Sequence, residues 1–205
     1  MHEILALFAQ TEVFIFVFME ILSKLDLSSR ILALTATWKD KIIFISLMGW
    51  FSIFGTLFGF QIENGAITNI RDLGPLVAGL CGGPFIGFVA GAIGGFHRFM
   101  LGGITAIPCG LSTMIAGLIG GGVYLLNKKK LVGVLWAILL AVAVEVVHGA
   151  LTLLLARPFD EALVVVKHAI PPMMLANGLG IAVSIIVLDR LKPRKPDQSN
   201  SIAWY

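Results

Sequence analysis

The chain has few charged residues for its length. Of its 205 residues, 13% are Asp, Glu, Lys or Arg, whereas 58% are hydrophobic, and the mean hydropathy is +0.94. A typical soluble domain has about 25% charged residues, so this chain lacks the polar side chains that would cover a water-soluble globule. The composition therefore predicts an integral membrane protein. The formal net charge is only +3, and we expect no nucleic-acid partner.

Cysteine is also scarce. The two cysteines, Cys81 and Cys109, both lie in apolar sequence and form no C-x-x-C motif. No cluster of histidines accompanies them, so the sequence gives no signal for zinc or for a redox centre. The chain also lacks paired acid and base residues, or a nucleophile triad, at a suitable spacing. We expect neither a cofactor nor a metal ion, and an intramembrane enzyme is the least favoured function class.

Long apolar runs dominate the sequence instead. A helix needs about 20 apolar residues to cross the hydrocarbon core of a bilayer, and five runs have about this length: 4–22, 42–60, 104–126, 131–156 and 168–188. The first run follows His2 and Glu3 instead of a basic segment and has no A-x-A-like cleavage site, so we interpret it as a retained helix. The runs predict an all-α membrane protein, a compact bundle of five to six transmembrane helices.

The segment 72–96 interrupts this pattern, because it is rich in glycine and contains Pro84. As one straight helix, the 27 positions from Arg71 to Arg98 would exceed the hydrocarbon core, spanning about 40 Å against about 30 Å. The two arginines would then lie at opposite faces. A re-entrant hairpin of 72–81 and 84–96, turning at Gly82-Gly83-Pro84, would bring them to one face. We favour the hairpin over a full crossing.

The basic residues support the same topology. Lys and Arg form three dense clusters, at 24–41, 128–130 and 190–195, and such clusters are enriched on the cytoplasmic side of membrane proteins. With the hairpin, eleven of the 15 Lys and Arg residues fall on that side, whereas a full crossing divides them nearly evenly. We therefore predict a multi-pass protein of the cytoplasmic membrane, with its N-terminus outside and its C-terminus in the cytoplasm.

Small residues mark where the helices approach closely. Sixteen of the 23 glycines lie between Gly65 and Gly122, and four of them form a ladder with a spacing of four, at Gly83, Gly87, Gly91 and Gly95. This spacing clears one face of a helix for a neighbour. The next apolar run contains matching small residues, namely Ser112, Thr113, Ala116, Gly117, Gly120 and Gly121. Close packing explains the glycines, but it leaves Arg71 and Arg98 unexplained.

Charged residues at membrane depth are costly, which makes these two arginines candidates for a binding site. Two guanidinium groups offer forked donors to a carboxylate. Cys109 and Ser112 lie three residues apart, so they share a helix face and can address a keto or hydroxyl oxygen. The four residues predict a pocket for a small organic acid.

Other polar residues are candidates for the pocket or for signal relay. Asn69, Asp72 and His97 lie beside the two arginines in the sequence. Glu145 and His148 form an E-x-x-H pair, a spacing that also occurs in di-iron bundles. The chain has one copy and no matching carboxylates in the other runs, so we favour a hydrogen-bonded pair or a relay over a metal site.

Four blocks, NIRDLGP, GGP, GFHRFMLGG and ITAIPCGLSTMIAGLIGG, resemble the five-transmembrane receptor domain of the LytS/YhcK type. This family is found at the N-terminus of bacterial sensor histidine kinases. The resemblance divides the chain into a first helix and cytoplasmic turn (1–27), a sensor domain (28–190) and a short polar cytoplasmic tail (191–205). The tail is too short for a kinase, so we expect the output domain to lie outside this chain.

The resemblance also implies a function. Family members that recognise pyruvate use two arginines, a cysteine and a serine, which correspond here to Arg71, Arg98, Cys109 and Ser112. We expect a dimeric sensor in the bacterial inner membrane that binds an extracellular carboxylate, with pyruvate the first choice. It would signal to a cytoplasmic histidine kinase and its response regulator. The alternative is the substrate-binding membrane subunit of a small-molecule transporter, because such subunits are also glycine-rich bundles with a cavity.

Overall fold

The computed structural model describes residues 2–61 and 67–191, and most of them are helical. Four helices have the length and apolar composition to cross a bilayer, namely α3 (Trp38–Leu57), α6 (Ala106–Leu126), α7 (Val134–Leu155) and α8 (Phe159–Asp189). They contain most of four of the expected spans, and the all-α membrane class is confirmed. The remaining expected span, 4–22, lies within α1 (His2–Ser23), and its passage through the bilayer stays a prediction.

The glycine-rich segment forms two helices, α4 (Leu73–Gly82) and α5 (Pro84–Met100). Gly83 separates them with a φ of 92°, a backbone conformation that glycine adopts without steric cost. Pro84 then starts α5 at a position that suits its fixed φ and its missing N–H. The chain reverses here, and Gly87 of α5 comes back against Gly79 of α4, so the two segments form a helical hairpin as expected. That the hairpin is re-entrant in the bilayer stays a prediction. A Cβ at Gly83 would lie 3.3 Å from the ring of Tyr124, so the turn lies level with the end of α6.

Backbone-to-backbone contacts join the hairpin to α6. An added Cβ at Gly91 of α5 would come within 2.6 Å of the Thr113 carbonyl oxygen. An added Cβ at Gly79 of α4, or at Gly87 of α5, would collide with the Gly117 carbonyl oxygen. We call these contacts among Gly79, Gly87, Gly91, Thr113 and Gly117 the glycine seam. They confirm that small residues let these helices approach closely.

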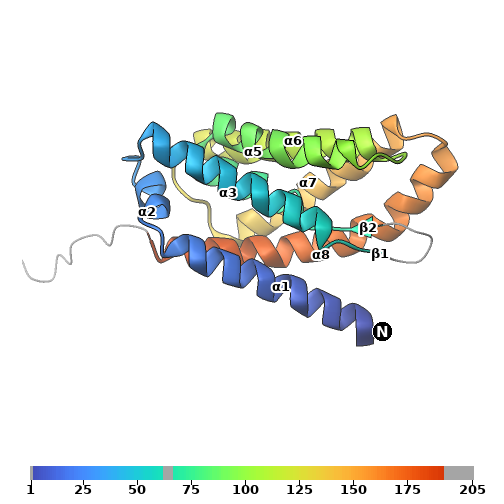
Figure 1. Ribbon diagram of the computed structural model, residues 1–205, viewed down its shortest axis with the longest axis horizontal. Coiled ribbons are helices and arrows are strands. Elements are labelled where there is room, and N and C mark those ends of the chain that lie inside the picture. Colours follow the sequence, from blue (N-terminus) through green and yellow to red (C-terminus); the bar gives the residue numbers. More distant parts are fainter. Residues whose placement is uncertain (1, 62–66, 192–205) are drawn as a thin grey trace, which may run out of the picture.

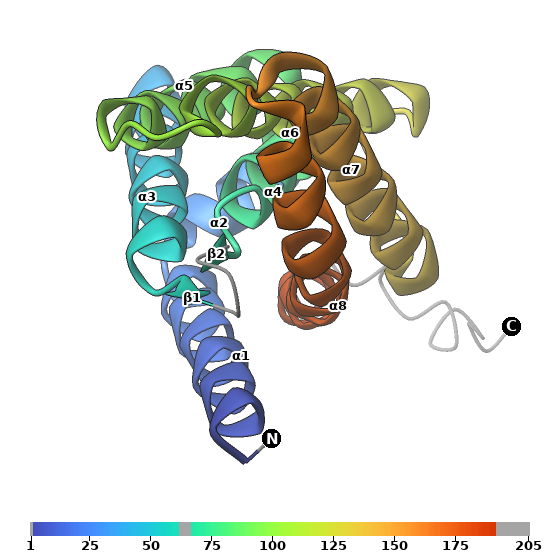
Figure 2. The same cartoon turned by 90° about the vertical axis from the view of Figure 1, so that its right-hand side faces the viewer.

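The short helix α4 occupies the middle of the bundle. Figure 2 shows it among α3, α5, α6 and α8. Residues 73–81 of α4 are all buried, as expected for a helix that is apolar on every side. Because Asp72 is the N-cap residue of α4, the central position of α4 puts the Asp72 carboxylate in the protein interior.

The two ends of the bundle differ in character (Figure 1). One end carries α2 (Asp26–Leu32), the start of α3, the turn after α6 and the end of α8. Its basic residues include Lys39 and Lys128–Lys130. The opposite end carries the α5–α6 turn, the α7–α8 turn and a two-stranded antiparallel ladder, β1 (Phe60–Gln61) with β2 (Ile67–Thr68). The sequence did not predict these strands.

Helix α8 is longer than the expected span 168–188, because it begins at Phe159. Pro171 and Pro172 lie inside it, where each removes a backbone donor and bends the helix. Figure 1 shows the orange first part of α8 running at an angle to the red remainder. The first part therefore leans over the end of the bundle that carries the α5–α6 turn.

Candidate functional site

A cavity of about 790 Å³ opens at the end of the bundle that carries the α5–α6 turn. Its walls come from α3, the end of α5, the α5–α6 turn, α6, α7, α8 and the segment just before α4. Its polar lining includes Thr56, Asn69, Arg71, Arg98, Thr105, Cys109, His148, Thr152, Glu161 and His168. Both arginines and Cys109 thus meet in one cavity, although they come from three different parts of the chain.

Arg71 is held firmly although its side chain is only 1% exposed. The Ser52 hydroxyl donates to its carbonyl oxygen at 2.9 Å, and its own N–H donates to Oδ1 of Asn69 at 3.2 Å. Its guanidinium donates from Nε to Thr113 Oγ1 at 2.8 Å and from Nη1 to Thr56 Oγ1 at 3.4 Å. The remaining nitrogen, Nη2, is buried and has no hydrogen-bond partner among the described residues. Arg71 therefore keeps an unused charged donor.

Arg98 lies in the last turn of α5 and is partly buried. Its Nη1 donates to the Gly102 carbonyl oxygen and its Nη2 donates to Thr105 Oγ1, both at 2.8 Å. Gly102 and Gly103 have positive φ values of 71° and 85°, so glycine is what allows this turn to fold back toward Arg98. The α5–α6 turn thus orients the second guanidinium at the cavity.

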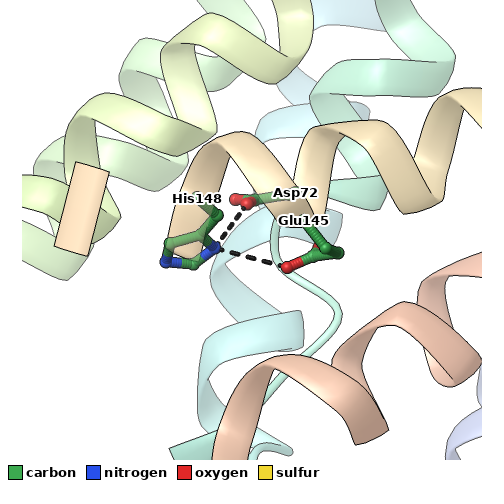
Figure 3. Close-up of side chains that lie close together, drawn as sticks. All are labelled: Asp72, Glu145 and His148. Atoms are coloured by element: carbon green, nitrogen blue, oxygen red, sulfur yellow. Dashed lines mark ion pairs between the residues drawn. The ribbon is translucent and has the colours of Figure 1, made fainter. Parts of the chain in front are cut away.

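Charged side chains cluster around Arg71, and Figure 3 shows three of them, Asp72, Glu145 and His148. The His148 Nδ1 atom lies 3.0 Å from Oδ2 of Asp72 and 3.4 Å from Oε2 of Glu145. Arg71 Nε lies 3.8 Å from Oδ1 of Asp72. We call Arg71, Asp72, Glu145 and His148 the charged cluster. All four are at most 2% exposed, so each charge depends on its neighbours for compensation.

Hydroxyl and amide groups complete the cluster. Thr113 Oγ1 and Ser112 Oγ donate to Asp72 at 2.6 Å and 3.1 Å. Asn177 Nδ2 on α8 donates to Glu145 Oε1 at 3.0 Å, and it also lies 3.2 Å from the Asn69 carbonyl oxygen. Negative charge at Asp72 is further favoured by its position at the N-terminus of α4. Three helices and the segment before α4 are therefore tied together through buried polar groups.

The structure divides the predicted site residues into two groups. Arg71, Arg98, Cys109, Asn69 and His148 line the cavity. In contrast, Ser112 is 1% exposed and its hydroxyl is directed to Asp72, so a direct contact between Ser112 and a ligand stays a prediction. Asp72 and Glu145 lie behind the lining, in the charged cluster.

His97 lies next to Arg98 on α5 but is not part of the cavity lining. Its Nδ1 is buried without a hydrogen-bond partner among the described residues. A role for His97 in the pocket or in relay therefore stays a prediction.

Asp72, Glu145 and His148 also have the donor types of a metal centre. One ligand atom from each lies within 4.8 Å of the others, and carboxylate and imidazole ligands suit several divalent cations. The Arg71 guanidinium beside Asp72 already supplies positive charge to this group. The expectation that the site holds no metal stays a prediction.

Two important residues were missed as site residues. Thr113 was seen only as a small packing residue, yet its hydroxyl accepts from Arg71 and donates to Asp72. Asn177, on α8, donates a hydrogen bond to Glu145 on α7. The sequence did offer a signal for each residue. Thr113 is a polar residue next to Ser112, and Asn177 is an isolated amide in an apolar helix.

Comparisons with known proteins agree with this architecture. The family model described as 5TMR of 5TMR-LYT matches residues 25–191. The chain belongs to this family. The resemblance drawn from the NIRDLGP and neighbouring blocks is thereby confirmed. No solved structure gives a significant match.

Several curated relatives of this 5TMR-LYT chain are named as sensors. The sensor histidine kinase BtsS of Escherichia coli (strain K12) is 33% identical over 176 residues, which is 83% of this chain and 31% of the relative. The sensor protein LytS of Bacillus subtilis (strain 168) is 31% identical over 182 residues, covering 80% and 30%. The chain thus spans about a third of the length of these relatives.

Proposed function

We propose that this chain is the membrane sensor part of a two-component histidine kinase and that it binds a small extracellular carboxylate such as pyruvate. The observation that carries the proposal is the buried, unpartnered Nη2 of Arg71 beside a cavity that Arg98 also lines. Burying a charged donor without a partner is costly. A carboxylate in the cavity removes that cost, because one of its oxygens accepts from Arg71 and the other from Arg98.

The rest of the cavity suits a short acid. Beyond the arginines its polar lining includes the Cys109 sulfur, the His148 ring, the Thr152 hydroxyl and, on α8, Glu161 and His168. The Glu161 carboxylate repels a second anionic group, so the lining fits a keto or hydroxyl oxygen better than a second carboxylate. A 2-oxo acid places both of its functional groups within the reach of such a lining.

The proposed orientation puts the cavity outside and the basic end of the bundle in the cytoplasm. The start of α3 and the turn after α6, which carry Lys39 and Lys128–Lys130, lie at the opposite end of the bundle from the α5–α6 turn (Figure 1), whose residues line the cavity. Clustered Lys and Arg favour the cytoplasmic side. In whole cells, we expect a membrane-impermeant maleimide to label Asp160→Cys, at the exposed start of α8, but not Lys129→Cys. Labelling of both variants, or of Lys129→Cys alone, contradicts the orientation. The background variant for this test lacks Cys81 and Cys109.

Signal output follows from the same orientation. Helix α8 contributes to the cavity wall and ends at Asp189, at the basic end of the bundle. A ligand that changes the angle of α8 near Pro171 and Pro172 can therefore act on an output domain on the cytoplasmic side. We propose a homodimeric kinase and a response regulator as the partners of this output.

A ligand panel tests the proposal. The protein in lipid nanodiscs is heated with pyruvate, lactate, acetate or the neutral ester ethyl pyruvate, and we expect stabilisation by pyruvate but not by its ester. Equal stabilisation by ester and acid contradicts carboxylate recognition. Uptake of labelled pyruvate into proteoliposomes separates the alternatives, because saturable binding without flux supports a sensor, whereas flux supports a transporter.

A further inference from the structure

Cys109 contacts a histidine inside the cavity. The Cys109 Sγ atom on α6 lies 3.2 Å from Nε2 of His148 on α7. The other ring nitrogen of His148 lies 3.0 Å from Asp72 and 3.4 Å from Glu145. A thiol, an imidazole and a carboxylate in sequence form the arrangement that activates cysteine nucleophiles.

The surroundings favour proton transfer from the thiol to the imidazole. The His148 Nδ1 lies near two carboxylates, whose negative charge favours a proton on that nitrogen. His148 Nε2 can therefore accept the thiol proton, and the imidazolium that forms is stabilised by Asp72 and Glu145. The resulting thiolate lies in a cavity lined by the Arg71 and Arg98 guanidiniums, and nearby positive charge stabilises thiolates.

We propose that Cys109 captures the keto carbon of a bound 2-oxo acid as a reversible thiohemiketal, an inference that rests on the proposed function. A sulfur electron pair forms the C–S bond, and the π electrons of the C=O bond move onto the keto oxygen. That oxygen takes the proton from His148 Nε2. The step is redox-neutral and needs no further reactant, and its reversal releases the acid unchanged.

Each neighbour has a distinct part in this step. Arg71 and Arg98 hold the carboxylate, so the adjacent keto carbon lies near the sulfur. Asp72 and Glu145 are positioning residues, because they contact the His148 ring and not the ligand. Lactate and acetate lack an electrophilic keto carbon, so they can occupy the cavity but form no bond to sulfur. Covalent capture thereby separates pyruvate from acids of similar size and charge.

The direct test is the ¹³C NMR spectrum of [2-¹³C]pyruvate bound to the 205-residue chain in lipid nanodiscs, with calorimetric titration in parallel. The background variant is Cys81→Ala, which removes the buried second thiol. We expect the bound keto carbon to move from the carbonyl region to the tetrahedral region, and Cys109→Ser to abolish this signal. Binding with the keto carbon still in the carbonyl region overturns the capture. Absence of binding in the titration overturns the proposed function together with it.

Thiol reactivity without any acid tests the activation by His148. We expect iodoacetamide at neutral pH to alkylate Cys109, and His148→Gln to slow this reaction by about tenfold or more. The control is His168→Gln, which removes a second imidazole of the same cavity lining. The Nδ1 of His168 lies 2.8 Å from the Val164 carbonyl oxygen, so this variant separates contact with Cys109 from loss of any cavity imidazole. Equal rates for His148→Gln and the wild type overturn the activation, even if pyruvate binds. Circular dichroism spectra of both variants check that their helices are intact.

Discussion

Helix α6 meets two different environments along its length. Toward its C-terminal end, the backbone at Gly117 touches the backbone of α4 and α5 in the glycine seam. Toward its N-terminal end, Thr113 and Cys109 carry polar groups to Arg71, Asp72 and the cavity. The seam has no space for even one methyl group, whereas the cavity leaves charged atoms without partners. The close-packed seam fixes the positions of the helices, and this rigidity lets the charged cluster keep unpartnered buried atoms beside the cavity.

The charged cluster is expected to respond most strongly to loss of one charge. Arg71→Ala removes the buried cation beside Asp72 and should lower the free energy of unfolding by about 3–5 kcal/mol. Chemical denaturation of the purified variant in detergent measures this loss. Arg157→Ala is the control, because this exposed arginine donates to backbone carbonyl oxygens, and it should change stability by less than about 0.5 kcal/mol. Similar stability of the two variants would show that the cluster does not depend on Arg71.

The glycine seam is expected to reject the smallest side chain. Gly87→Ala brings its Cβ against the Gly117 carbonyl oxygen and should cost about 1–3 kcal/mol. Gly122→Ala on α6 is the matched control, since nothing lies within 4 Å of its added Cβ. That variant should be neutral or more stable by up to about 1 kcal/mol. The melting temperature should therefore fall for Gly87→Ala and stay the same or rise for Gly122→Ala, and an equal fall in both variants would refute the seam.

The two regions also differ in how well sequence alone predicted them. Glycine spacing indicates which face of α5 is free of side chains, and small residues at a four-residue period on α6 supply the matching face, so the α5–α6 part of the glycine seam was predicted. The contact of Gly79 on α4 with Gly117 was not. The hairpin followed from helix length, Pro84 and the basic clusters. Residue spacing, helix length and the position of basic clusters can all be read from the sequence without knowing which helices pack together.

The charged cluster could be recognised only from the three-dimensional fold. Periodicity placed Ser112 on the same face as Cys109, but it could not show that the neighbour of Ser112 is Asp72. His148 was paired with Glu145 through their spacing, whereas its contacts with Asp72 and Cys109 depend on how α4, α6 and α7 pack. The absence of a nucleophile motif in the sequence was therefore a poor guide, because these residues come together only in three dimensions.

A smaller effect is expected at the boundary between seam and cluster. Ser112→Ala removes one donor to Asp72, which should loosen the hold on His148 and cost about 1 kcal/mol, or near fivefold in pyruvate affinity. Acetate affinity should change little, because acetate does not require the capture step. Parallel titrations with both acids measure the difference. Equal losses for pyruvate and acetate would mean that Ser112 shapes the cavity without affecting the keto group.

The central claim is that Arg71 and Arg98 hold the same carboxylate. Titration calorimetry of pyruvate with Arg98→Ala, Arg71→Lys and the double variant tests it, since lysine keeps a cation beside Asp72 but loses the forked donor. Arg98→Ala alone should weaken binding by about 10- to 150-fold. If both arginines hold one anion, the double variant should lose less than the sum of the single losses, by more than about 0.5 kcal/mol. Strictly additive losses, or wild-type affinity in either single variant, would contradict the account.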